Sequence, residues 1–397
     1  MSHVISETLA TEIKGKCEVL VAGGGIAGIA AALAAARTGA GVLLLEREYI
    51  LGGLGTAGIV TIYLPLCDGL GNQVSFGIAE ELLRLSIQHG AEDKYPAVWL
   101  DKPDADQSER AKVRFEVQYN PHMFALSAEK LLAETGVRIL YGTTAAAVHT
   151  ENGKIDAVIV ENKSGRYAIA VEKAVVDCTG DADICALSGE KTANFAQGNI
   201  LAAWHYFIAS GSLKLRMLGA CDVPDKQKNG TEVPPLVKRR FGGLDGQELS
   251  EMVMLSHERI YKDILEFKKK DPSHVPVTLP TIPQIRMTRR IDGEYVMDDT
   301  EMHKDFADSV GTFSDWRKRG PVYKLPFSTL HGSRVRNLIC AGRCISVTDA
   351  MWDITRVIPV CAVSGQAAGT AAAMFDDFTN ADVELLRKKL VSDGVRI

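Results

Sequence analysis

The feature that most constrains this chain is the glycine-rich turn Gly23-Gly-Gly-Ile-Ala-Gly28, close to its N-terminus. The apolar segment 17–22 before it predicts a buried parallel strand, and the alanine-rich segment 29–38 after it predicts a helix. A second apolar run, 41–46, predicts another buried strand that ends at Glu46. Together these segments form the strand–turn–helix–strand unit that binds the diphosphate of a dinucleotide.

Each glycine of this turn pattern has a mechanical purpose. Gly23 permits the tight turn, Gly25 lets a diphosphate approach the backbone, and Gly28 lets the helix pack closely on the strand. The helix start at Ile26 and Ala27 presents free N–H groups and a partial positive charge to the phosphates.

The acid that ends the second strand indicates which dinucleotide fits. Glu46 is expected to accept hydrogen bonds from ribose hydroxyls, and Arg47 follows it. Because a carboxylate repels a 2′-phosphate, Glu46 disfavours NADP. The next segment is a second glycine-rich loop, 51–58, where Gly53, Leu54 and Thr56 are expected to lie against the diphosphate and the flavin linker. This loop favours FAD over NAD.

Three further motifs extend the pattern over the chain: 174–183, the arginine-rich segment 282–294, and 337–346, which continues through 356–359 to 365–369. In these motifs the sequence resembles the FAD-dependent oxidoreductase family, which has the glutathione-reductase-type FAD fold. The resemblance implies FAD as the cofactor. It also implies cofactor contacts at Thr179, Gly180, Asp181, Gly342, Arg343, Arg356, Pro359, Gly365, Gln366, Ala367 and Ala368.

Two further expectations concern the ends of the cofactor. A helix of small residues should start near Gly365, so that its N-terminus stabilises negative charge on the reduced flavin. The segment 144–148, including Ala147 and Val148, should contact the adenine through its backbone.

The positions of the motifs determine the expected fold. They lie at both ends and in the middle of the chain, so we predict an α/β fold with a discontinuous, Rossmann-like FAD-binding domain, built as a three-layer ββα arrangement around a parallel sheet. This domain should comprise 1–66, 119–190 and 335–397. The inserted segments 67–118 and 191–334 should form an α+β substrate or cap domain, with a strand at 199–208 and a long amphipathic helix at 246–270.

The flavin carries out the redox step, so the protein must position a substrate and manage a proton. His205, in an aromatic strand, is the first candidate for the proton, with a purely structural role as the alternative. Tyr63, after the second glycine-rich loop, is another candidate. Arg289 and Arg290 cannot point the same way on a strand, so one is expected to anchor an anionic substrate and the other to make a structural ion pair.

Composition and motif absences exclude several classes of protein. The net charge is −5 with no long basic block, which argues against nucleic acid as a partner. The polar segment 1–16 does not resemble a signal peptide and no long uncharged apolar stretch predicts a membrane span, so we expect a cytoplasmic protein. The eight cysteines form no C-x-x-C pair, and no ligand cluster has metal spacing, so no metal site is expected.

The sequence therefore predicts an FAD-dependent dehydrogenase or reductase. Hydride would pass between flavin N5 and a small organic substrate, at either a hydroxyl-bearing carbon or an activated C=C bond. No further G-x-G-x-x-G occurs beyond the glycine-rich segments 23–28 and 51–58, so a separate NAD(P)H domain is not expected and electrons should pass to a diffusing substrate, O₂ or a partner protein. The alternatives are a flavin monooxygenase and a non-catalytic FAD-binding subunit of a larger redox complex. Homo-oligomer formation is left open.

Overall fold

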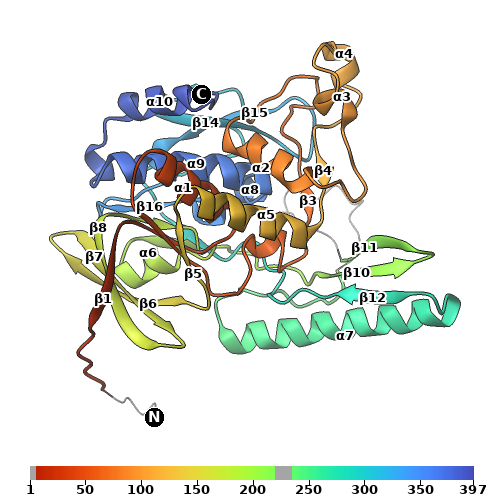
Figure 1. The fold of residues 1–397 in the computed structure, drawn as a ribbon, viewed down its shortest axis with the longest axis horizontal. Coiled ribbons are helices and arrows are strands. Elements are labelled where there is room, and N and C mark those ends of the chain that lie inside the picture. Colours follow the sequence, from red (N-terminus) through yellow and green to blue (C-terminus); the bar gives the residue numbers. More distant parts are fainter. Residues whose placement is uncertain (1–5, 220–234) are drawn as a thin grey trace.

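The computed structural model describes residues 6–219 and 235–397. Its central element is a mixed, seven-stranded sheet in the order β5-β2-β1-β8-β7-β6, with β16 paired to β8 (Figure 1). The strands are β1 (Ile13–Ala22), β2 (Val42–Leu45), β5 (Arg138–Leu140), β6 (Thr144–Glu151), β7 (Lys154–Asn162), β8 (Gly165–Asp177) and β16 (Leu338–Cys340). The α/β fold class predicted from the sequence is confirmed.

Strand β8 belongs to two parts of this sheet. Its first half pairs antiparallel with β7, and its second half lies parallel between β1 and β16. The segment is one continuous strand, because β1 pairs with it along almost all of its own length, from Ile13 with Ala168 to Ala22 with Asp177. The carboxyl ends of four parallel strands consequently lie in register, at Ala22, Leu45, Asp177 and Cys340.

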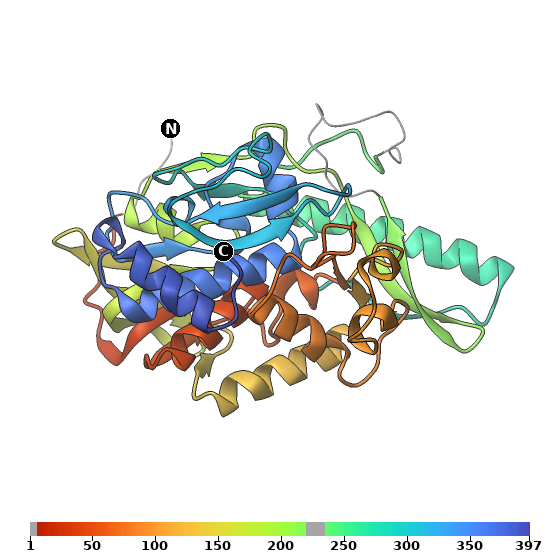
Figure 2. The same cartoon turned by 90° about the horizontal axis from the view of Figure 1, so that it is seen from above.

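Two helices far apart in sequence cover one face of the sheet. Helix α1 (Ile26–Arg37) and helix α9 (Ile358–Met374) lie side by side (Figure 2). A Cβ atom on Gly365 or Gly369 would overlap the carbonyl oxygen of Ala27 or Ala31, so the two helix backbones touch. The predicted helix start near Gly365 is therefore wrong: α9 begins at Ile358, and its small residues allow this close packing.

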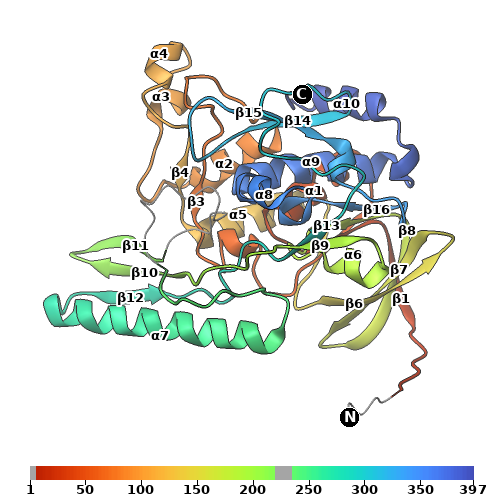
Figure 3. The same ribbon diagram turned by 180° about the vertical axis from the view of Figure 1, so that it is seen from behind.

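A smaller sheet and a long helix lie together at one end of the molecule (Figures 1 and 3). Strands β10 (Ala203–Ala209), β11 (Ser212–Leu218) and β12 (Val275–Thr278) form the order β11-β10-β12. Helix α7 (Gly246–Lys270) has the predicted bounds, and the Asp245 carboxylate caps it by accepting the Glu248 N–H. It buries a single stripe formed by Met252, Ser256 and Ile260.

The remaining elements connect or cover these two parts. They are β3 (Ile62–Tyr63), β4 (Val117–Gln118), β9 (Thr192–Asn194), β13 (Arg289–Ile291), β14 (Ser309–Ser314), β15 (Val322–Pro326), α2 (Ile78–Ile87), α3 (Ala97–Leu100), α4 (Gln107–Arg110), α5 (Pro121–Glu134), α6 (Asp183–Ser188), α8 (Asp349–Thr355) and α10 (Val383–Ser392). The main sheet lies inside the ranges predicted for the FAD-binding domain, and α7 with its sheet lies inside the predicted insertion; the division into domains stays a prediction.

Within the described ranges, no single helix is long and apolar enough to cross a membrane. The pair α8 and α9 meets the length and composition criteria jointly, but it is bent by 91° and its side chains are almost all buried in the fold.

Candidate functional site

A cavity of about 450 Å³ lies at the edge where the four parallel strands end. Its wall includes Ala22, Leu45, Cys178 and Ala341, which are the last strand residues or their direct successors. Ligands of open α/β sheets bind outside the carboxyl ends of the strands. The position of the cavity therefore follows from the sheet topology.

The first glycine-rich turn forms one wall of this cavity. Gly23 has a φ of +98°, and a Cβ there would lie 2.5 Å from the Cys178 oxygen. A Cβ on Gly28 would overlap the carbonyl oxygen of Gly23, so this glycine allows the helix to sit on the strand. Gly25 differs, because its Cβ would meet no protein atom within 4 Å and the residue lines the cavity. The space beside Gly25 fits a diphosphate.

Two helices begin at the cavity wall. Helix α1 follows Gly25 and helix α9 follows Val357; neither has a side-chain cap or an acidic residue in its first turn. Their first N–H groups and dipoles therefore favour negative charge on a ligand at two separate points. This arrangement suits a cofactor with a diphosphate at one point and an electron-accepting ring at the other.

Glu46 is fixed at the end of β2. Its Oε2 accepts the Gly24 N–H at 2.8 Å and its Oε1 accepts the Glu48 N–H at 2.8 Å. Burial raises the pKa of Glu46, and the two backbone hydrogen bonds oppose that rise. The carboxylate lines the cavity next to Arg47, where ribose hydroxyls were expected to bind.

Next to Glu46, whose carbonyl accepts the Thr143 N–H at 3.0 Å, the chain at the start of β6 lines the cavity. Thr143, Thr144 and Ala145 form this part of the wall. Ala147 and Val148, the predicted adenine contacts, lie outside it, because β6 runs away from the cavity as it pairs with β7. The residues that line the cavity, 143–145, therefore lie at the beginning of the segment predicted to contact the adenine, and the contact itself stays a prediction.

The turn 179–181 is tied to the arginine-rich segment. The Asp181 carboxylate accepts the Thr288 hydroxyl at 2.6 Å and contacts Arg343 at 3.5 Å. Arg343 donates to the Arg286 carbonyl at 2.6 Å and covers Gly180, where a Cβ would overlap its guanidinium. These contacts join three of the sequence motifs into one wall.

Two arginine–tryptophan pairs line the cavity, one next to β10 and one next to the start of α9. The Arg286 guanidinium lies 5.0 Å from the Trp204 ring centroid, and the Arg356 guanidinium lies 6.0 Å from that of Trp316. Arg356 also forms a 2.5 Å ion pair with Asp353. Apolar side chains next to the Arg286–Trp204 pair form the apolar end of the cavity: Met217, Leu249, Ile282, Pro283 and Ile285. The chemistry here suits an apolar ligand with one anionic or carbonyl oxygen.

The two predicted proton carriers do not reach this cavity. His205 is fully buried, and the adjacent Trp204 lines the cavity, so His205 faces the opposite side of β10. Burial lowers the pKa of His205 to about 4. Tyr63 is also fully buried between two lining residues, Ile62 and Leu64, and its hydroxyl donates to the Ala79 carbonyl at 2.6 Å. In each case a neighbour in sequence lines the cavity in place of the candidate: Trp204 in place of His205, and Ile62 and Leu64 in place of Tyr63.

The arginine pair is also placed away from the wall. Arg289 forms a 2.7 Å ion pair with Asp183 and donates to the Asp181 carbonyl at 2.9 Å. Arg290 is buried with its guanidinium 5.9 Å from the Trp352 ring centroid. Of the two roles predicted for this pair, substrate anchor and structural ion pair, Arg289 fits the structural ion pair. The arginine of this motif that lines the cavity is Arg286, three residues earlier, which is 2% exposed and donates to the Gln284 carbonyl at 3.3 Å.

The other predicted cofactor residues divide into two groups. Those that line the cavity are Gly23, Gly25, Ile26, Ala27, Glu46, Arg47, Gly53, Leu54, Thr179, Gly180, Asp181, Gly342, Arg343 and Arg356. Outside it, besides Ala147 and Val148, lie Gly28, Thr56, Pro359, Gly365, Gln366, Ala367 and Ala368. The contacts of this second group are internal: the Gln366 Oε1 accepts the Ile78 N–H at 2.8 Å, and the Thr56 hydroxyl donates to the Leu51 carbonyl at 2.5 Å.

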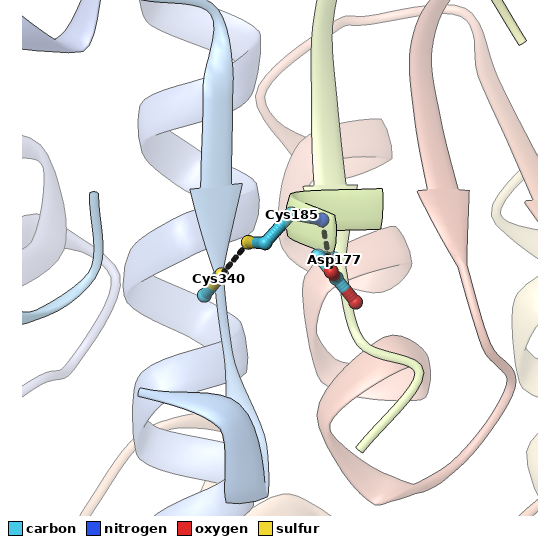
Figure 4. Close-up of side chains that lie close together, drawn as sticks. All are labelled: Asp177, Cys185 and Cys340. Atoms are coloured by element: carbon cyan, nitrogen blue, oxygen red, sulfur yellow. Dashed lines mark hydrogen bonds between the residues drawn. The ribbon is translucent and has the colours of Figure 1, made fainter. Parts of the chain in front are cut away.

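Three buried groups below the cavity are close enough to resemble a metal site. Asp177, Cys185 and Cys340 bring their ligand atoms within 4.8 Å of one another, and the two sulfur atoms are 3.2 Å apart (Figure 4). The S–H···S contact lowers the pKa of Cys185, but burial and its acidic neighbours outweigh it and raise the pKa to about 12. The Asp177 carboxylate already accepts hydrogen bonds from the Thr179 hydroxyl and the Cys185 N–H. Protonated thiols are poor metal ligands, and the absence of a metal stays a prediction.

Comparison with known proteins agrees with this geometry. The family described as FAD dependent oxidoreductase matches residues 18–202 and 216–388. No curated protein gives a significant match.

Solved structures with a similar fold are distant. They include a geranylgeranyl bacteriochlorophyll reductase-like protein from Thermoplasma acidophilum (TM-score 0.48, 16% identity, 95% of this chain and 83% of that one) and a 3-ketosteroid-Δ4-(5α)-dehydrogenase from Rhodococcus jostii RHA1 (TM-score 0.42, 14% identity, 91% and 98%). At these identities and scores, the neighbours carry no information on the substrate.

Proposed function

Since the chain belongs to the FAD-dependent oxidoreductase family, we propose that it transfers hydride between FAD and a small, largely apolar substrate whose carbonyl or anionic oxygen binds Arg286. The observation that carries this proposal is the position of Arg286, which lines the apolar end of the cavity against Trp204. The substrate is either oxidised at a hydroxyl-bearing carbon or reduced at an activated C=C bond.

The residues on the cavity wall fit FAD in a defined direction. Bound FAD supplies hydride chemistry at flavin N5. The start of α1 beside Gly25 would hold the diphosphate, and Glu46 would hold the ribose. The start of α9 and Arg356 would face the ring, where they favour negative charge.

Arg286 has a specific electrostatic task in this proposal. A carbonyl or carboxylate oxygen that accepts its N–H groups gains stabilisation as negative charge develops on that oxygen. The surrounding apolar wall strengthens this effect, because it keeps bulk water from the charge. The proton that accompanies hydride transfer is not assigned to His205 or Tyr63, since both lie outside the cavity.

Anaerobic half-reactions of the FAD-loaded enzyme test the proposal. The oxidised enzyme is mixed with a panel of hydroxy acids and secondary alcohols, and the reduced enzyme with α,β-unsaturated acids and ketones, while the visible flavin absorbance is followed. We expect one class to change the flavin redox state with saturation kinetics. Arg286→Met should then lower kcat/KM about 100-fold, because a charged hydrogen bond is lost, and Arg286→Lys should recover part of it.

Arg289→Met is the matched control, because Arg289 belongs to the same motif but lies outside the cavity. It should keep kcat/KM within a few-fold of wild type. An Arg286→Met variant as active as the native enzyme, or a silent panel in both directions, would contradict the proposal.

A further inference from the structure

A second cavity, of about 270 Å³, lies between helix α7 and the segment 279–284. From α7, Val253, Ser256 and His257 contribute to its wall, and Leu279 contributes from the opposite side. No predicted site residue lies here, and the first cavity does not include any residue of the stripe that α7 buries.

The two cavities share a wall. Ile282 and Pro283 line both of them, and both residues are only partly buried. The adjacent Gln284 also connects the two: its side-chain oxygen accepts the backbone N–H of Trp204 at 2.9 Å, and its side-chain amide donates to the Gly58 carbonyl at 2.7 Å. The second cavity therefore adjoins the Arg286 and Trp204 end of the first.

The wall of the second cavity selects for an apolar occupant. Its buried polar side chains are already hydrogen-bonded within the protein, since Ser256 donates to the Ala202 carbonyl at 3.1 Å and Gln284 is occupied as described. His257 is exposed to solvent, so its polar ring does not require a partner inside the cavity. An apolar cavity of about 150 Å³ is large enough to bind benzene, so this larger one accommodates an extended hydrocarbon group.

We propose that the second cavity binds an apolar chain of the same substrate whose oxygen binds Arg286. The chain passes Ile282 and Pro283 and ends beside α7. This inference rests on the proposed function and specifies its substrate class: an oxygen-bearing head with a hydrocarbon tail of several carbons. Helix α7 then limits the length of the tail that the enzyme accepts. This helix belongs to the predicted insertion and not to the FAD-binding sheet.

Straight-chain alkanoates from butanoate to dodecanoate are the probes. Their dissociation constants are measured on the oxidised, FAD-loaded enzyme from the perturbation of its visible flavin spectrum. The Kd should fall about fourfold for each methylene that becomes buried, and level off once the tail fills the second cavity.

Two variants fill this cavity from opposite sides: Val253→Trp from α7 and Leu279→Trp from the 279–284 segment. Each should weaken decanoate binding at least tenfold and leave butanoate binding within twofold of wild type. Leu279 is 40% exposed, so its substitution is tolerated even if that at Val253 impairs folding. Met254→Trp is the control, because Met254 neighbours Val253 but is 65% exposed and lies outside the cavity.

The outcomes separate the two proposals. If alkanoates of every length fail to bind, or bind as well to Arg286→Met as to wild type, the proposed function is wrong at its anion site. If they bind through Arg286 but show no dependence on length, or if both filling variants bind decanoate normally, the tail site is overturned and the proposed function stands.

Discussion

The glycines of the first turn differ in what a methyl group would meet. At Gly25 it would enter open space in the cavity, whereas at Gly28 it would overlap the Gly23 carbonyl. Gly25→Ala should therefore leave the apoprotein as stable as wild type but weaken FAD binding at least tenfold, because the methyl group occupies the space expected for the diphosphate. Gly28→Ala should destabilise the apoprotein itself, as overpacking does, by about 1–3 kcal/mol.

Urea unfolding of the apoproteins and fluorescence titration with FAD measure these two effects separately. Equal loss of stability in both variants would contradict the assignment of Gly25 to the cofactor.

His205 predicts a pH dependence of stability. Burial lowers its pKa from 6.5 to about 4 in the folded chain, so below pH 6.5 the unfolded chain binds a proton that the folded chain does not. Its contribution is intact above pH 6.5 and is lost progressively down to about pH 4, by about 3 kcal/mol in total. His205→Phe should remove this part of the pH dependence.

The measurement is the difference in unfolding free energy between variant and wild type from pH 7 to pH 4. His257→Gln, at an exposed position of α7, serves as the control and should keep the wild-type profile. A His205→Phe profile parallel to that of wild type would show that His205 titrates normally.

Among the helices, α2 depends on a side chain from α9. The Ile78 N–H, at the start of α2, donates to Gln366. Gln366→Leu leaves this buried donor unsatisfied and should destabilise the protein by about 1–3 kcal/mol. FAD affinity should not change, because Gln366 lies outside the cavity. Thermal unfolding of the Gln366→Leu variant measures the loss of stability, and titration with FAD measures its cofactor affinity. A weakened FAD affinity would show that Gln366 does contribute to the cofactor site.

The sequence predicted elements better than it predicted which way their side chains point. Helix α7 was placed correctly because one apolar stripe alternates with a charged surface. Helix α9 is buried on nearly all sides, so no periodicity indicated where it begins. For His205 and Tyr63, the sequence did not show which face of the strand points to the cavity. Trp204 and Ile62 line the cavity instead. The polarity pattern could not reveal this, because the residues on both faces of these strands are mostly apolar or aromatic.

The cofactor should stabilise the chain as a unit, because its predicted site draws on segments from residue 22 to residue 361. A ligand that binds only the folded state adds about 2.7 kcal/mol of stability at a hundredfold excess over its Kd. We expect FAD to raise Tm progressively with concentration, and Gly25→Ala to abolish the rise. A calorimetric scan in which FAD leaves Tm unchanged would mean that it does not bind the folded chain selectively.

The pairing of β16 with β8, and of α9 with α1, has a consequence for biosynthesis. These contacts join residues more than 150 positions apart, so the chain has a high contact order and its central sheet should fold slowly. During translation, β1 and α1 leave the ribosome long before their partners, and their apolar surfaces stay uncovered until roughly the last sixty residues follow. A ribosome-bound chain stalled before residue 338 should remain sensitive to protease in segment 13–37, and the full-length released chain should be protected there.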